Sequence, residues 1–244
     1  MSEPSPAKRR KVRQTDSDLQ SFAGETIQVL VGASETPFTV QKSILSSNSE
    51  YFERMLRNDF KESLEGVSKL PKHTPEAFEI FMNFIYRGNI YSATEAGSQL
   101  TGKDKHTAFA NEMNKILQAI SLANYLQSDG FQNATITALF QCVSDYQLLP
   151  TTRKLLDKAV DMNIASLTEV FQDFFVLQGS GGWSAFSEET ADPSEADFWK
   201  GIAKKAIIEL RNREKVNHVI KAVETRDLDP CKYHIHRDGK KCSN

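Results

Sequence analysis

The sequence predicts an α+β fold in which a small sheet flanked by helices is followed by an all-α extension. Between residues 26 and 40, apolar and polar residues alternate on both sides of a GASETP turn, a pattern typical of a β-hairpin. From residue 42 onward, apolar residues recur at helical spacing, with helix-capping residues between the stripes. A chain of 244 residues with 39% hydrophobic residues is also long enough to bury a sizeable core.

The first elements follow from local patterns taken in chain order. Alternation over residues 27–31 gives the first strand one apolar face, and residues 38–40 form the second strand. A short helix is expected to begin at Lys42. Ser49 suits the N-cap of the following helix, because its hydroxyl can accept a hydrogen bond from the first turn.

The next elements are a third strand and a helix with well-marked ends. Residues 67–70 are predicted as the strand. Thr74 is the expected N-cap of the helix, Pro75 takes its first position, and Gly88 ends it. A brief strand is expected at 89–91.

The remainder is predicted to be helical apart from two polar loops. The first loop is an insertion at residues 92–108, and the second is the Gly/Ser-rich stretch around residue 180. Amphipathic stripes place the helices at about 111–126, 132–143, 155–160 and 167–174, and from 194 onward.

Composition divides the chain into four regions. Residues 1–20 are basic and rich in Ser and Pro, so we expect a disordered tail. Residues 21–146 form the α+β domain, residues 147–228 a helical extension, and residues 229–244 a tail that contains Cys and His.

Charge and cysteine usage narrow the class of protein. The net charge of −2 gives no global basic field that would attract nucleic acid. Three cysteines argue against a disulfide framework and favour an intracellular compartment. No apolar run reaches the length of a membrane span, and the N-terminal segment lacks the apolar core of a secretory signal.

Five motifs in register resemble the BTB/POZ domain, over residue 22 to about residue 143. They are FTVQKSIL (38–45), SEYFERML (49–56), FKES (60–63), PEAFEIFMNFIYRGNI (75–90) and LANYLQSDGFQNATI (122–136). The chain departs from the family pattern at Gln41, where His is usual, and at Asn124, where Asp is usual. The long insertion, the last helix and the Cys/His tail resemble BTB proteins of filamentous fungi.

This resemblance implies a protein–protein interaction module. It implies self-association through the front strand and first helices, and often capture of a cullin scaffold by later helices. The chain would then be an adaptor of a ubiquitin ligase. An isologous homodimer is expected, and we assign Phe22, Ile27 and Leu30 to its surface.

The basic N-terminal segment is a candidate nuclear-import signal, because an extended basic peptide can lie in an acidic importin groove. Its residues are Lys8, Arg9, Arg10, Lys11 and Arg13. The alternatives are a solvated tail and non-specific contact with nucleic acid. We therefore expect importin as a partner and the nucleus as the compartment, with the cytoplasm as a second one.

The C-terminal tail carries four side chains of the types that bind zinc. They are Cys231, His234, His236 and Cys242. Zinc favours four such nitrogen and sulfur donors in a tetrahedral array. The alternative is a small packed tail without metal, and no other cofactor is expected.

No nucleophile–base pair, paired carboxylates or cofactor fingerprint is visible, so we do not expect an enzyme. The near P-loop at 97–104 ends in Asp104 instead of the Ser or Thr that holds magnesium. The main alternative to an adaptor is a nuclear transcription regulator or corepressor platform that oligomerises through its BTB domain. Direct sequence-specific binding of nucleic acid is not expected, because the body is nearly neutral.

Overall fold

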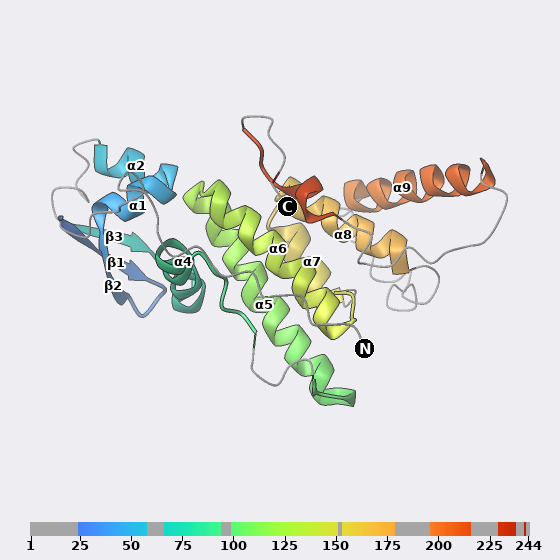
Figure 1. The fold of residues 1–244 in the computed structure, drawn as a ribbon, viewed down its shortest axis with the longest axis horizontal. Helices are drawn as coiled ribbons and strands as arrows, with labels where there is room; N and C mark the ends of the chain where they lie inside the picture. Colours follow the sequence, from blue (N-terminus) through green and yellow to red (C-terminus); the bar gives the residue numbers. More distant parts are fainter. Residues whose placement is uncertain are drawn as a thin grey trace, which may run out of the picture.

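The computed structural model describes residues 24–57, 66–93, 99–150, 153–178, 196–215, 229–237 and 242. A small sheet lies at one end of the molecule, and the helices extend from it toward the other end (Figure 1). The predicted α+β class is thereby confirmed. None of the described helices combines the length and apolar content that crossing a membrane requires.

The sheet has three strands in the order β2-β1-β3. Strands β1 (Thr26–Val31) and β2 (Thr36–Gln41) form the predicted antiparallel hairpin, with Val29 opposite Phe38. Strand β3 (Val67–Leu70) runs parallel to β1, as expected for strands joined by helices. One face of the sheet is buried in the core.

Three helices pack next to the sheet and match the predicted ones. They are α1 (Lys42–Asn48), α2 (Glu50–Arg57) and α4 (Pro75–Arg87). The Thr74 hydroxyl accepts a hydrogen bond from the amide of Ala77 at 3.3 Å, and Gly88 ends α4 with a φ of 73°. This left-handed conformation is one that glycine adopts without strain.

The strand predicted at 89–91 is wrong, since these described residues form none. The apolar character behind that prediction has another cause. Ile90 packs against both hydrophobic cores while the chain passes between them.

Helices α5 (Gly102–Leu126) and α6 (Asp129–Tyr146) form a long hairpin. Helix α5 begins at Gly102, whereas the sequence placed its start near residue 111. Residues 102–108 of the predicted insertion loop are therefore helical. Phe109, which is 5% exposed and packs 5.6 Å from the ring of Tyr146, fixes this first part of the helix against α6.

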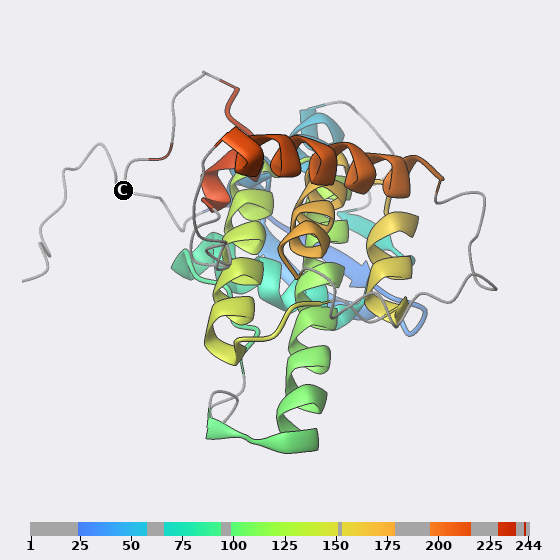
Figure 2. The ribbon, with the colours of Figure 1, turned by 90° about the vertical axis from the view of Figure 1, so that its right-hand side faces the viewer.

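The last helices cover the far side of that hairpin. They are α7 (Arg153–Asp161), α8 (Ala165–Gln178) and α9 (Ala196–Lys215), followed by the short 3₁₀ helix η8 (Pro230–Tyr233). Figure 2 shows α9 lying across the neighbouring helices. In the same region, η8 packs against α6 and α8.

Two hydrophobic cores share the α5–α6 hairpin. One core joins the sheet, α1, α2 and α4 to the C-terminal part of α5 and to Phe131. The other joins the first part of α5 and most of α6 to α7, α8, α9 and Tyr233. The described part of the predicted extension at 147–228 therefore packs directly on the α+β domain. The second core contains residues from both sides of residue 146.

Candidate functional site

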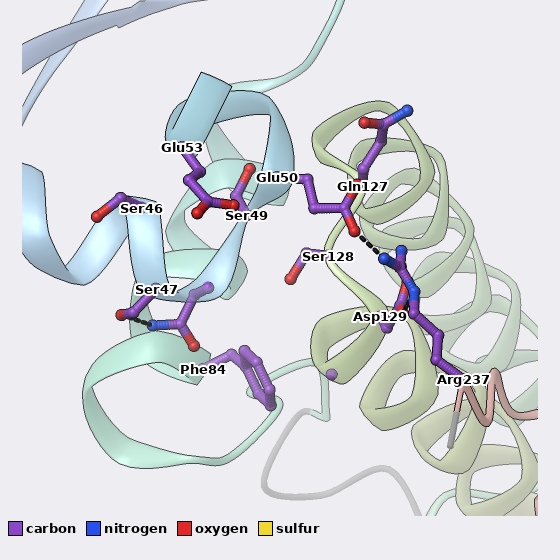
Figure 3. A pocket seen from close by; sticks show the side chains of 12 residues that line it. Ser46, Ser47, Ser49, Glu50, Glu53, Phe84, Gln127, Ser128, Asp129 and Arg237 are labelled. Atoms are coloured by element: carbon purple, nitrogen blue, oxygen red, sulfur yellow. Dashed lines mark hydrogen bonds and ion pairs between the residues drawn. The ribbon is translucent and has the colours of Figure 1, made fainter. Parts of the chain in front are cut away.

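A polar pocket of about 290 Å³ opens where the first helices meet the α5–α6 turn and the C-terminal tail. Figure 3 shows its lining side chains converging from these elements. The residues that line it are Ser46, Ser47, Asn48, Ser49, Glu50, Glu53, Phe84, Gln127, Ser128, Asp129, Gly130 and Arg237. The polar run between α1 and α2 thus forms one wall.

Ser49 holds this wall in place. Its hydroxyl donates to the carbonyl of Leu126 at 2.6 Å and accepts from the amide of Phe52 at 3.3 Å. The same side chain therefore caps α2, as predicted, and ties α2 to the end of α5. The α5–α6 turn follows directly, with Gln127 in the left-handed conformation at a φ of 51°.

Arg237 closes the pocket from the tail side. Its guanidinium pairs with the carboxylates of Glu50 on α2 and Asp129 on α6, and Nη2 donates to Asp129 Oδ1 at 3.0 Å. Glu50 also pairs with Arg54 at 2.7 Å. Because these groups are partly exposed, water screens them and the pairs position the tail more than they stabilise it.

An exposed aromatic surface lies beside the pocket wall. Tyr125 on α5 is 45% exposed, and its ring lies 5.1 Å from Tyr51 and 4.8 Å from His73. Burial lowers the pKa of His73, which favours its neutral imidazole. Large aromatic side chains of this kind are enriched at protein–protein interfaces.

The four predicted zinc ligands lie together. One ligand atom from each of Cys231, His234, His236 and Cys242 lies within 4.8 Å of every other. Burial raises the pKa of Cys142, the other cysteine, which sits in the core as the sequence indicated. That thiol is neutral and inert.

The residues predicted for import and dimerisation have different outcomes. The basic segment and Phe22 lie outside the described residues. Ile27 is only 1% exposed and belongs to the monomer core, so its apolar side chain serves folding and is not free for a dimer surface. Leu30, on the opposite face of β1, is half-buried and stays a candidate.

Comparison with known proteins identifies the fold. Residues 19–142, just over half of the chain, match the BTB/POZ domain. The chain belongs to the BTB/POZ domain family. It is also 27% identical over 145 residues to Kelch-like protein 25 of Xenopus tropicalis. That match covers 55% of this chain but only 25% of the relative. This BTB protein therefore spans about a quarter of the length of that relative.

Domains of this family are protein–protein interaction modules that also dimerise. The resemblance to filamentous-fungal members stays a prediction. Sequence reasoning missed the convergence of Glu50, Asp129 and Arg237, which are separated by long stretches of chain. The local signal for this pocket was the polar run between α1 and α2, where the apolar pattern of the two helices stops.

Proposed function

We propose that this BTB protein is an adaptor that links a target protein to the cullin scaffold of a ubiquitin ligase. The observation that carries the proposal is the match to the BTB/POZ domain over residues 19–142. The similarity to Kelch-like protein 25, over 145 residues, is consistent with a cullin partner.

The surface that we assign to the cullin comprises Tyr125, Tyr51 and the pocket wall that starts at Ser49. Tyr125 offers a large ring at 45% exposure, and an aromatic side chain of this kind can anchor a partner at low cost in side-chain entropy. The polar groups of the wall can form the hydrogen-bonded rim that surrounds such an anchor. The helical extension is then left to bind the target.

Direct binding tests this assignment. The purified full-length chain is titrated with purified cullin N-terminal domains in a calorimeter, and saturable binding is expected. Tyr125→Ala should weaken binding at least tenfold. Ile207→Ala is the matched control, since Ile207 is 50% exposed on α9, which lies at the opposite end of the molecule from α2 (Figure 1).

Two results would count against the proposal. Absence of binding to every cullin at tens of micromolar protein would remove the adaptor function. Binding that both variants retain equally would keep the adaptor function and remove the assigned surface. Far-UV circular dichroism of both variants checks that helical content is unchanged.

Homodimerisation is the second part of the proposal. The family supports it, and the half-buried Leu30 on β1 is the described candidate for the contact. Light scattering on the size-exclusion peak should give twice the chain mass of 27.5 kDa. A mass of one chain at micromolar concentration would contradict it.

A nuclear transcription regulator is the second candidate function, and the basic segment favours it. Lys8, Arg9, Arg10, Lys11 and Arg13 would bind importin and bring the protein into the nucleus. Changing the first four to Ala in a fluorescent fusion should abolish nuclear enrichment. A pull-down from nuclear extract that yields chromatin proteins and no cullin would favour the regulator over the adaptor.

A further inference from the structure

The Cys/His cluster of the tail has the dimensions of a metal site. In a tetrahedral zinc site, Zn–S bonds of about 2.3 Å and Zn–N bonds of about 2.0–2.1 Å place ligand atoms about 3.3–3.8 Å apart. Cys231 Sγ lies 3.3 Å from His236 Nε2, and His234 Nδ1 lies 3.1 Å from Cys242 Sγ. The largest separation, at most 4.8 Å, needs a closure of about one ångström.

Backbone conformation explains why these side chains converge. Cys231 and His234 are three residues apart around η8, and side chains at this spacing eclipse in a 3₁₀ turn. His234 then has an extended backbone with a ψ of 150°. Residues two apart along an extended chain face the same side, so His236 joins the other two.

The tail is anchored to α6 on both sides of His234. Asn133 on α6 accepts from the amide of Ile235 at 2.7 Å and donates to its carbonyl at 3.0 Å. The Tyr233 ring stacks on Phe140 at 5.4 Å. The amide of Cys231 also donates to the Asp229 carboxylate at 2.9 Å. These contacts hold the tail in place without using the sulfur or ring nitrogen atoms that would bind the metal.

A hydrogen bond from α6 prepares His234 as a ligand. The Thr137 hydroxyl donates its proton to the carbonyl of Asn133 at 3.0 Å. Its oxygen, 3.0 Å from His234 Nε2, is therefore left to accept the N–H of that ring. The imidazole is then protonated at Nε2, and Nδ1, the atom that faces Cys242, keeps its lone pair. Such outer hydrogen bonds are usual for histidines that bind metals.

We propose that Cys231, His234, His236 and Cys242 bind one zinc ion that cross-links the C-terminal tail to itself and holds it in the shape that packs on α6 and α8. Two thiolates and two neutral imidazoles balance the charge of Zn²⁺, which suits a half-buried site. Four protein donors leave no open position, so the site is structural. Because Arg237 follows His236 directly, the metal also holds its guanidinium at the pocket between Glu50 and Asp129.

Metal analysis of the full-length chain tests the site. Protein purified without chelator should contain about one equivalent of zinc, as a closed four-ligand site requires. The double variant Cys231→Ser, Cys242→Ser should contain none. Cys142→Ala is the matched control and should keep its zinc, because Cys142 lies in the core.

Cobalt replacement gives a readout that does not depend on how the variants fold. Wild-type protein stripped with a chelator and titrated with Co²⁺ should develop intense visible d–d bands of a tetrahedral complex and a thiolate charge-transfer band in the near ultraviolet. Zn²⁺ should bleach both. Removal of metal should also speed hydrogen exchange at the amide of Ile235, with little change in the sheet.

Three outcomes would overturn the proposal. One is wild-type protein that contains no zinc and gives no cobalt spectrum. Another is a double variant that keeps its full zinc content. The third is a disulfide between Cys231 and Cys242 in protein prepared with zinc, detected by peptide mapping without reductant; both are free thiols in the structure.

Discussion

Asp173 on α8 accepts hydrogen bonds that tie both α9 and the C-terminal tail to α8. Its carboxylate accepts from Lys205 Nζ at 2.5 Å, from Lys232 Nζ at 2.8 Å and from the Tyr233 hydroxyl at 2.5 Å. The side chain is only 13% exposed. Asp173→Asn keeps its shape but removes the charge and one acceptor oxygen, so it isolates the electrostatic contribution.

The loss of folding stability in Asp173→Asn can be estimated from these contacts. A hydrogen bond that involves a charged group contributes about 1.5–3 kcal/mol, and loss of a buried partner costs more than loss of an exposed one. Lys232 is 52% exposed, so water can replace its lost partner. Lys205 is only 24% exposed, so its ammonium group is hydrated less well after the substitution. We therefore expect Asp173→Asn to lower the free energy of unfolding at pH 7 by about 2–3 kcal/mol.

The effect should depend on pH in a definite direction. Burial alone would raise the pKa of Asp173, but the hydrogen bonds from Lys205, Lys232 and Tyr233 outweigh it and hold that pKa below its usual value. A carboxylate with a lowered pKa contributes stability above its unfolded pKa of about 3.9 and loses it as the pH falls through the folded value. The difference between wild type and variant should therefore be full at pH 5–7 and shrink below about pH 3.9.

Urea unfolding followed by circular dichroism at stepped pH measures this difference. Asp197→Asn is the control, because Asp197 is 96% exposed and its pair with Lys200 spans 3.5 Å. That control should unfold like wild type. Equal stability of Asp173→Asn and wild type at pH 7, or a loss of the same size at pH 3, would refute the reasoning.

Three further changes test the α+β domain. Phe131→Ala removes a side chain that is 0% exposed, so the free energy of unfolding in urea should fall by about 3–5 kcal/mol. Ser49→Ala removes the bonds to Leu126 and Phe52 and should cost about 1–2 kcal/mol in the same assay. Gly88→Ala places a side chain at a φ of 73° and should cost about 1 kcal/mol, measured as a lower Tm. Unchanged stability in any of the three would contradict the contact on which it rests.

Local signals predicted the elements whose ends are set by neighbouring residues. Thr74, Pro75 and Gly88 marked both ends of α4, because capping and backbone conformation act within one turn of helix. Alternation around the GASETP turn likewise predicted the β1–β2 hairpin, whereas its register came from the structure. The same reasoning failed at residues 89–91. Ile90 packs between the two cores, and the backbone there pairs with no described strand.

The start of α5 shows where local signals end. Residues 102–108 are polar and read as loop, yet they are helical because Phe109 and Met113 are buried against distant parts of the chain. The pocket is a similar case, since Glu50 and Arg237 meet only after the tail has docked. No short-range pattern encodes such a contact.

The sequence by itself determined the fold family, the sheet, the capped helices and which four residues could bind zinc. Only the tertiary structure decided that these four side chains converge and that the helical extension shares a core with the BTB domain. The physical reason is the distance along the chain over which each kind of interaction acts. Caps, turns and hydrophobic periodicity act over a few residues, whereas the docking of Tyr233 on Phe140 and of Ile235 on Asn133 depends on contacts between segments far apart in the chain.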